Sequence, residues 1–270
     1  MFKFSISNIA LNAFDHTKQL QILPELGFQG IEVAPSRVWK NTWHGLTANQ
    51  VDNYRQSVEK ADLKIVGLHS LFFDHPELGL FRNSAGRKET LEFLQHLSLV
   101  CRDLGGKTLI WGSGRRRKKI SSVDAYSETL DFMGLLCSKI EDHGTCFCFE
   151  PLGPSDTDFL NSARETTRLA KQLNHPAVKV QLDAKALIEN GEATLDVFKE
   201  TASLLVHFHA NEPGLGILGS SGQVNHSTLS KYLKKIRYNG YISVEQRQLN
   251  QKTALQDIQK SASTLIKAYR

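Results

Sequence analysis

Four side chains that commonly ligate metal ions stand at the ends of four short apolar segments in the second half of this sequence: Glu150, Asp183, His209 and Glu245. Each segment is typical of a β-strand, and polar or turn-forming residues follow it. Two glutamates, one aspartate and one histidine form an oxygen-rich donor set that suits one divalent cation. A cation next to carboxylates can stabilise negative charge while a carboxylate moves a proton. The pattern therefore predicts a metal-dependent enzyme.

The alternation of side chains along a strand supports this grouping. Residues two apart in a strand face the same side, so the four ligand-type residues can all face one interior if their strands are in phase. The residue before each of them is apolar, as expected for a side chain that faces outer helices: Phe149, Leu182, Phe208 and Val244. One such residue alone would more often start a loop or cap a helix, but four concordant strand ends favour a site.

Strand-like segments alternate with amphipathic, helix-like segments along the whole chain. The eight strand-like segments lie at residues 4–8, 30–34, 64–69, 107–112, 145–150, 178–183, 204–209 and 240–245. This alternation predicts a parallel sheet, and eight units within 270 residues favour a closed (βα)8 TIM barrel of the α/β class. No G-x-G-x-x-G motif follows the first strand, which argues against a dinucleotide-binding fold. We expect a single domain over residues 1–270, with the site at the carboxyl ends of its strands.

Two details of the predicted helices are specific enough to compare with the structure. Leu20, Leu23 and Leu26 recur at helical spacing and predict a helix before the second strand. Thr47 stands before an amphipathic segment and is a predicted N-cap. Several predicted helices end in glycine-containing turns, which are a common signal for a helix C-terminus.

The composition is typical of a globular protein. The hydrophobic content is 40% and the charged content 23%, and no apolar stretch approaches the roughly 20 residues that span a bilayer. The first residues show no signal-peptide h-region, so we expect a cytoplasmic protein. The net charge of +5 permits an anionic substrate without requiring a nucleic acid. Cys146 and Cys148 share the parity of Glu150, and we interpret them as packing residues because neither ends its strand.

Several motifs at these strand ends carry a resemblance that covers essentially the whole chain. They are Phe149-Glu150-Pro151-Leu152, Leu182-Asp183, His207-Phe208-His209-Ala210-Asn211-Glu212-Pro213 and Ser243-Val244-Glu245. The chain thereby resembles the xylose isomerase-like barrel superfamily. Within it, the chain is similar to the sugar phosphate isomerase/epimerase group, which is related to ketose 3-epimerases and to endonuclease IV. The motifs are specific to the superfamily and not to one reaction within it.

The resemblance implies that Glu150, Asp183, His209 and Glu245 ligate one Mn²⁺, Mg²⁺, Co²⁺ or Zn²⁺ ion. It also implies that Glu150 and Glu245 act as an acid/base pair on opposite faces of a bound small-molecule carbohydrate. Removing the hydrogen next to a carbonyl creates an enediolate. Return of the proton to the opposite face of the same carbon gives epimerisation, and return to the neighbouring carbon gives isomerisation. The expected substrate is a small sugar, sugar acid or sugar phosphate. Proteins of this group are often dimers or tetramers, which suggests a homo-oligomer.

Seven further residues are candidates for substrate binding because they lie at strand ends or on the loops that follow them: Glu32, His69, Trp111, Arg115, Lys185, His207 and His226. For Glu32, a salt bridge to a helix or loop is an equal alternative. His69 resembles a position that binds substrate in isomerases and metal in endonuclease IV, and a hydrogen-bonded structural histidine is the alternative. His207 lies one layer deeper than His209 and would orient a ligand through a hydrogen bond.

The remaining candidates each have a structural alternative. Trp111 either forms an apolar wall against a sugar or simply packs. Lys185 and His226 either contact substrate or lie at the surface of their loops. Arg115 begins a run of five basic residues, 115–119, which either binds a phosphate or carboxylate of the substrate or forms a solvated loop.

Two departures from the epimerase pattern weaken the assignment to a free-ketose 3-epimerase. Those relatives carry a histidine where this chain has Ala186, and an arginine that has no counterpart in Pro213-Gly214-Leu215-Gly216. A lyase or dehydratase of the same superfamily would use the same metal and carboxylates. An endonuclease IV-like phosphodiesterase needs further ligands where Gly112 and Ala186 stand, and one basic loop is a small footprint for DNA. A barrel that binds a sugar without turnover is disfavoured by the complete ligand set.

Overall fold

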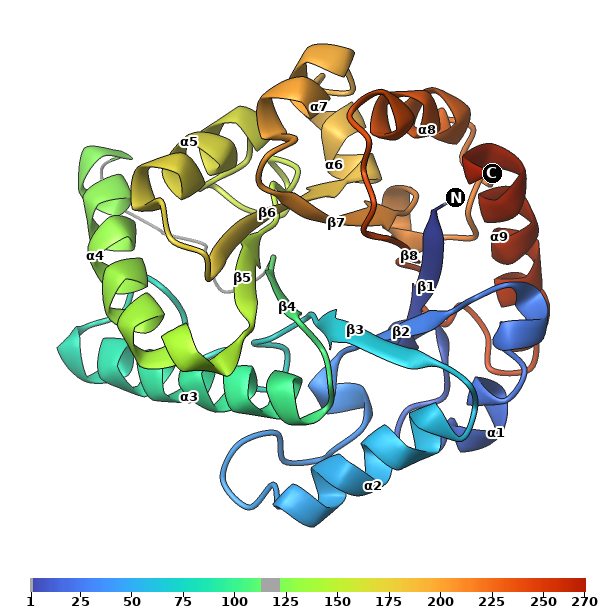
Figure 1. Ribbon diagram of the computed structural model, residues 1–270, viewed down its shortest axis with the longest axis horizontal. Coiled ribbons are helices and arrows are strands. Elements are labelled where there is room, and N and C mark those ends of the chain that lie inside the picture. The colour runs from blue at the N-terminus through green and yellow to red at the C-terminus, as the bar shows by residue number, and fades with distance from the viewer. Residues whose placement is uncertain (1, 113–121) are drawn as a thin grey trace.

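The computed structural model, which describes residues 2–112 and 122–270, forms a closed barrel of eight parallel strands enclosed by helices (Figure 1). The strands are β1 (Lys3–Ser7), β2 (Gly30–Val33), β3 (Lys64–Leu68), β4 (Thr108–Trp111), β5 (Cys146–Phe149), β6 (Val178–Asp183), β7 (Leu205–Ala210) and β8 (Tyr241–Val244). They follow one another around the barrel, and β1 closes it by pairing in parallel with β8. The predicted (βα)8 TIM barrel of the α/β class is confirmed, and each strand lies within one residue of its predicted bounds.

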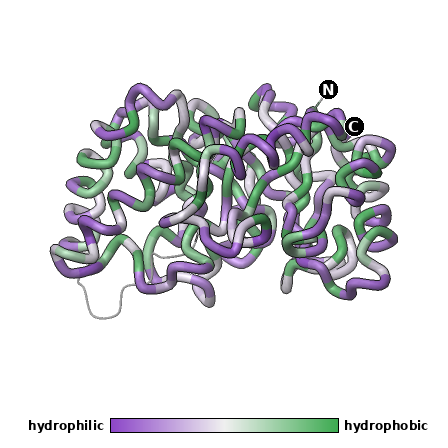
Figure 2. Tube along the Cα trace, turned by 90° about the horizontal axis from the view of Figure 1, so that it is seen from below, coloured by the Kyte–Doolittle hydropathy of each residue, from purple (hydrophilic) through white to green (hydrophobic). Residues whose placement is uncertain are grey.

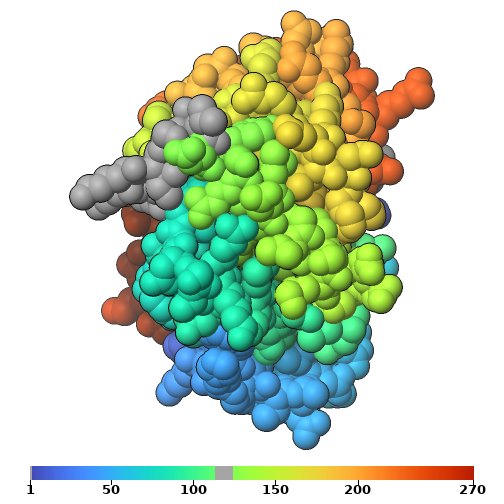
Figure 3. Space-filling view, turned by 90° about the vertical axis from the view of Figure 1, so that its left-hand side faces the viewer, coloured from blue at the N-terminus to red at the C-terminus, as the bar shows by residue number. Residues whose placement is uncertain are grey.

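Helices connect the strands and form the outer layer. The α-helices are α1 (Thr17–Leu20), α2 (Ala48–Glu59), α3 (Ser84–Asp103), α4 (Ser122–Ile140), α5 (Ala163–Leu173), α6 (Ala184–Glu189), α7 (Leu195–Thr201), α8 (His226–Lys235) and α9 (Ala254–Tyr269). Short 3₁₀ helices are η1 (Asn8–Ala10), η2 (Pro24–Leu26), η3 (Pro35–Arg37), η4 (Glu141–His143) and η5 (Pro213–Leu215). Figure 3 shows the side of the molecule that is formed by the segments around α2, α3, α4 and α5.

The N-cap predicted at Thr47 is confirmed. Its side chain accepts a hydrogen bond from the backbone N–H of Gln50, and the Gln50 side chain accepts one from the backbone N–H of Thr47. This reciprocal pair is a capping box, which satisfies N–H groups that the first helical turn leaves without partners. The start of α2 is therefore determined by residues within one turn of each other.

The helix predicted from Leu20, Leu23 and Leu26 is wrong in its extent. The chain forms only the four-residue α1 and then η2, which begins at Pro24. Pro24 has no backbone N–H with which to continue an α-helical ladder, so it starts a new short helix instead. Leu20 and Leu23 are nevertheless fully buried in the core. The leucine spacing thus reports core packing and not one continuous helix.

Apolar side chains between the strands and the helices form most of the core. On β5, Phe147 and Phe149 are fully buried and lie next to Trp111 of β4. Hydrophobic stretches run through the interior, while hydrophilic stretches lie mostly at the periphery (Figure 2). Both ends of the chain lie close together on one side of the barrel (Figures 1 and 2). Among the described helices, none combines the length and the hydropathy needed to cross a membrane.

Candidate metal centre

The four strand-end residues converge at the carboxyl end of the barrel, and their ligand atoms all lie within 4.8 Å of one another. His209 Nδ1 is 3.0 Å from Glu150 Oε1 and 3.5 Å from Glu245 Oε2. Asp183 Oδ2 lies 3.8 Å from the same nitrogen. Opposite ligands of an ion with bonds of about 2.1 Å lie about 4.2 Å apart. Shifts of a few tenths of an ångström would therefore let the four donors hold one divalent cation.

Each donor is positioned by the end of its own strand. Asp183 is the last residue of β6 and His209 the next to last of β7, while Glu150 and Glu245 directly follow β5 and β8. Asp183 has a second role, because its Oδ1 accepts a hydrogen bond of 2.7 Å from the backbone N–H of Ala186 and caps α6. Three donors are buried and Glu245 is partly exposed, with 14% of its side-chain surface accessible. A small molecule would therefore reach the cluster on the Glu245 side.

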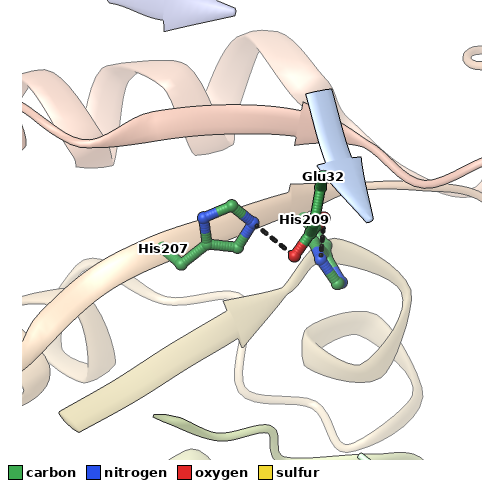
Figure 4. Close-up of side chains that lie close together, drawn as sticks. All are labelled: Glu32, His207 and His209. Atoms are coloured by element: carbon green, nitrogen blue, oxygen red, sulfur yellow. Dashed lines mark hydrogen bonds and ion pairs between the residues drawn. The ribbon is translucent and has the colours of Figure 1, made fainter. Parts of the chain in front are cut away.

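Glu32 fixes the orientation of His209 from deeper in the barrel (Figure 4). The Nε2–H of His209 donates a hydrogen bond of 2.9 Å to Glu32 Oε2, and Ser243 Oγ donates one of 2.9 Å to the same oxygen. Nδ1 is then the nitrogen that faces the carboxylate cluster. In a metal-binding histidine, a carboxylate that accepts a hydrogen bond from the ring nitrogen not bound to the metal sets the tautomer and the orientation of the ring. Glu32 is fully buried, and contact between Glu32 and substrate stays a prediction.

Replacing Glu32 by glutamine is expected to weaken metal binding about tenfold to hundredfold. The amide keeps the shape of the side chain but removes the charge that holds the Nε2–H of His209. Competitive titration against a metal-sensitive chelating dye measures the affinity. Glu89→Gln, at an exposed position of α3, is the matched control. Equal affinities in the two variants would contradict the role assigned to Glu32.

The cluster concentrates negative charge in a buried space. Burial raises the pKa of Glu150 and of Asp183. For His209, burial alone would lower the pKa, but the surrounding carboxylates, Glu32 foremost, raise it well above its usual value. For Glu245, burial would raise the pKa, but the charge of His209 and a hydrogen bond with it lower the pKa below its usual value. A positive charge at the centre, whether a proton on His209 or a metal ion, therefore stabilises the ionised carboxylates.

Asn211 links two of the carboxylates and was not predicted from the sequence. Its Nδ2 donates hydrogen bonds to Asp183 Oδ2 and, at 2.9 Å, to Glu245 Oε2. Its Oδ1 accepts a bond of 2.9 Å from the backbone N–H of Lys185. Asn211 stands two residues after His209, and this shared parity was the signal that could have identified it. The buried amide positions two of the three carboxylates that face Nδ1 of His209.

Gly112, just beyond β4, leaves the space that the Glu150 carboxylate occupies. A Cβ atom added at Gly112 would lie 2.2 Å from Glu150 Oε2, far inside van der Waals contact. Any side chain at this position would therefore push the carboxylate away from the cluster. The glycine contributes to the site by having no side chain.

Gly112→Ala is expected to lower metal affinity and turnover by on the order of tenfold to hundredfold, because Glu150 must move to admit the methyl group. Gly134→Ala is the matched control, since a Cβ atom at Gly134 in α4 meets no atom within 4 Å. Metal titration and activity assays on both variants measure the effect. If the Gly112 variant behaves like the Gly134 variant, Glu150 does not need this space.

His207 and His69 lie next to the cluster. His207 is fully buried one layer deeper, with Nε2 3.2 Å from Glu32 Oε1 (Figure 4). A direct contact between His207 and substrate stays a prediction. His69 Nε2 is hydrogen-bonded to Ser7 Oγ at 2.6 Å, and its Nδ1 lies 3.7 Å from Glu245 Oε1. His69 thus supports the one partly exposed carboxylate, and its contact with substrate stays a prediction.

Two candidates have protein partners away from the cluster, and their contact with substrate stays a prediction. Trp111 is fully buried and stacks on Phe149, because its parity directs the side chain outward to the helices. Both ring nitrogens of the buried His226 have protein partners at 2.9 Å: Nε2 contacts Glu212 Oε1 and Nδ1 contacts Tyr269 Oη. His226 therefore anchors the loop that follows β7 to α9.

Lys185 lies on the rim of the barrel but contacts protein groups. Its Nζ is 2.5 Å from Asp156 Oδ2 and 3.8 Å from Glu189 Oε1. The pair with Asp156 ties the loop after β5 to α6, and contact between Lys185 and substrate stays a prediction. Arg115 and the rest of the basic run 115–119 lie outside the described residues.

Comparison of the whole chain with known proteins identifies a matching family and a closely similar fold. The family model described as a xylose isomerase-like TIM barrel matches residues 20–268. A crystal structure of a D-psicose 3-epimerase with D-tagatose, from Clostridium cellulolyticum H10, superimposes with a TM-score of 0.85 over 100% of both chains. The sequence identity in this pair is 17%, so the similarity shows a shared fold.

Curated proteins match in sequence over parts of the chain, and two of them illustrate the range. A D-psicose 3-epimerase of Ruminiclostridium cellulolyticum is 25% identical over 128 residues, which are 47% of this chain and 43% of that protein. A 3-dehydroshikimate dehydratase of Bacillus anthracis is 21% identical over 209 residues, which are 77% of this chain and 70% of that protein. The match to the epimerase thus spans less than half of its length, whereas the match to the dehydratase spans most of it.

Proposed function

The chain belongs to the xylose isomerase-like TIM barrel family, and we propose that it is a divalent-metal-dependent isomerase or epimerase of a small sugar, sugar acid or sugar phosphate. The observation that carries this proposal is the convergence of four donors at the carboxyl end of the barrel: Glu150, Asp183, His209 and Glu245. Barrels of this type hold their catalytic groups at that end. The similarity to D-psicose 3-epimerase, in fold and in part of the sequence, supports a sugar as the substrate class.

The ion would be held by one oxygen from each of the three carboxylates and by Nδ1 of His209. Bound there, a divalent ion supplies positive charge that stabilises an anion developing on the oxygens of a carbonyl compound. Glu32 and Asn211 keep the donors in place, since one holds the far nitrogen of His209 and the other bridges two carboxylates. Their hydrogen bonds prepare the site before the substrate enters.

Glu150 and Glu245 are the proposed acid/base pair. They follow β5 and β8, so they approach a bound molecule from different parts of the barrel rim. Glu150 Oε1 and Glu245 Oε2 face His209 Nδ1, and each carboxylate has a second oxygen that can carry a proton. One carboxylate removes the hydrogen next to the carbonyl. Return of a proton by the other carboxylate, to the opposite face, yields the epimer.

A dehydratase activity is the second candidate, because the match to 3-dehydroshikimate dehydratase covers 77% of the chain. Elimination starts with the same proton removal next to a carbonyl and continues with the loss of a protonated hydroxyl group as water. A nuclease of the endonuclease IV type has less support. Within the described residues, the two groups able to hold an ion share His209, and neither Gly112 nor Ala186 supplies a donor side chain.

Incubation in D₂O with a panel of ketoses, aldoses, sugar acids and sugar phosphates distinguishes these reactions. Deuterium next to a carbonyl, detected by NMR with the metal-loaded protein and not with the metal-stripped protein, supports the proposed function. Formation of a carbon–carbon double bond identifies the dehydratase. Neither exchange nor conversion with any compound of the panel would contradict both candidates.

A further inference from the structure

A cavity of about 1240 Å³ opens at the end of the barrel opposite to the carboxylate cluster. Its wall is formed by residues at or next to the starts of the strands, such as Lys3 of β1, Lys64 of β3 and Tyr241 of β8. The interior of a TIM barrel is normally filled by layers of bulky side chains. A cavity of this volume can hold a small molecule, so the chemistry of its wall indicates what kind of molecule would bind.

Two glycines help to keep this mouth of the barrel open. Gly105 and Gly144 lie on the cavity wall, and a Cβ atom added at either position would meet no atom within 4 Å. Both adopt the left-handed conformation, with φ of 81° and 70°, which favours glycine over residues with side chains. The two turns that precede β4 and β5 therefore place backbone, and no side chain, at the entrance.

Thr108 presents a hydroxyl group that no described residue uses. It forms part of the cavity wall, is only 6% exposed, and its Oγ1 has no hydrogen-bond partner among the residues that the structure describes. Ser5 Oγ and the side-chain amide of Gln181, deeper in the barrel, are likewise buried without a described partner. A buried polar group without a partner is unfavourable, and a ligand with acceptor oxygens can satisfy a hydroxyl on the wall.

Three ammonium groups surround the entrance. Lys3, Lys64 and Lys107 lie on the wall at or next to the starts of β1, β3 and β4, and none of them has an ion pair with a described residue. The Lys3 ammonium lies 5.6 Å from the centroid of the Tyr241 ring, which is also part of the wall. These positive charges are available to attract an anion.

The acidic side chains on the wall do not cancel this charge. Glu59 is paired at 2.8 Å with Arg55, which lies on the same wall. Asp62 and Glu141 are the other two carboxylates among the described lining residues. Three lysines that have no ion pair against two carboxylates leave a net charge of +1, which suits an anion with a single charge.

Much of the remaining wall is apolar. It includes Leu63, Ile65, Val66, Leu104, Pro176 and Val206. We propose that this amino-terminal cavity binds an organic monoanion with an apolar body, such as an aromatic carboxylate or sulfonate. The charged group accepts a hydrogen bond from Thr108 and is attracted by the lysines, while the body packs against the apolar wall. The site lies at the opposite end of the barrel from the carboxylate cluster and does not depend on the function proposed for that cluster.

Titration with anilinonaphthalene sulfonate tests the proposal, because this probe is an aromatic monoanion whose fluorescence increases in apolar surroundings. We expect saturation at about one equivalent per chain. Lys3→Gln and Lys107→Gln should each weaken its binding by roughly fivefold, which is the effect of one nearby charge in water. N-phenylnaphthylamine has the same aromatic framework without the sulfonate, and it should bind equally well to the parent protein and to both variants.

Further variants separate the parts of the cavity. Val206→Trp places a large ring on the apolar wall and should weaken the binding of both probes, whereas Thr108→Val keeps the shape and should weaken the binding of the sulfonate alone. Lys88→Gln and Phe73→Ala are matched controls that do not line the cavity, and both should bind the sulfonate like the parent protein. The Lys88 side chain is 79% exposed at the start of α3, and Phe73 is 75% exposed on the loop after β3.

The proposal fails if the parent protein gives no fluorescence increase, or if sulfonate binding is unchanged in both lysine variants. Loss of binding in Phe73→Ala would place the probe on the exposed rim and would also overturn it. Circular dichroism and thermal melting establish that each variant is folded, since this probe also binds partly unfolded chains. Lys3 and Lys107 are exposed, so their variants carry the test if Val206→Trp is unstable. Glu245→Gln should keep full sulfonate binding, which makes the result independent of the carboxylate cluster.

Discussion

Replacing Glu245 by glutamine is expected to lower turnover by a factor of roughly 10² to 10⁴ while one ion stays bound. The amide keeps an oxygen that can ligate the metal, but it cannot accept the proton that a carboxylate removes from carbon. In the structure, Glu245 Oε2 lies 3.5 Å from His209 Nδ1 and accepts a hydrogen bond from Asn211. Glutamine preserves the position of this oxygen, so the variant separates proton transfer from metal binding.

Two measurements decide the outcome for Glu245→Gln. Elemental analysis gives the metal content, and turnover is measured with the compound that exchanges deuterium fastest. Glu150→Gln should also lose conversion, because a two-base reaction needs both carboxylates. Glu89→Gln on the exposed face of α3 controls for the loss of one charge. Turnover close to that of the parent protein, with metal bound, would remove Glu245 from the acid/base pair.

Replacing Asp183 by alanine is expected to weaken metal binding by more than about a hundredfold. Loss of a residue that only hydrogen-bonds to a ligand costs about tenfold to hundredfold, and loss of a direct ligand costs more. Asp183 Oδ2 faces His209 Nδ1 at 3.8 Å, and Oδ1 caps α6 through the backbone N–H of Ala186. The alanine variant also loses this cap, at a cost of about 1 kcal/mol in the free energy of unfolding. Loss of metal and loss of stability must therefore be measured separately.

Two controls separate the metal ligand from the helix cap. Asp183→Asn keeps an oxygen for the cap and removes the charge, so it should retain most of the stability and still bind metal weakly. Thr194→Ala removes the N-cap of α7, away from the cluster. In the parent protein, the Thr194 side chain accepts a hydrogen bond from the backbone N–H of Val197. The Thr194 variant should have a lower melting temperature and keep one ion bound. Full metal content in both Asp183 variants would contradict the ligand set.

Much of the fold could be predicted because the relevant signals are local. The eight strands follow from apolar segments of four to six residues. The start of α2 follows from a capping box at Thr47 and Gln50. The extent of the first helix was mispredicted because the spacing of three leucines was followed across Pro24. Proline is also a local signal. Because Pro24 has no backbone N–H, the end of the α-helix before it could have been predicted.

Trp111 and His226 show what local signals leave undecided about the site. Both lie at or after strand ends, which made them candidates, but side-chain direction decides whether such a residue enters the barrel. Trp111 faces the helices and packs on Phe149. His226 is held between Glu212 and Tyr269, and the latter lies 43 residues away in the chain. These partners become neighbours only when the barrel closes.

By itself, the sequence determined the four candidate ligands and the barrel that gathers them, because each ligand ends its own strand and parallel strands of one barrel end on the same side. Tertiary structure alone decided how the ligands are held. Glu32 orients His209 across 177 positions of the chain, and Gly112 makes room for Glu150 on the neighbouring strand. Such contacts depend on the stagger and closure of the strands, which arise from packing of the whole barrel and which no local pattern specifies.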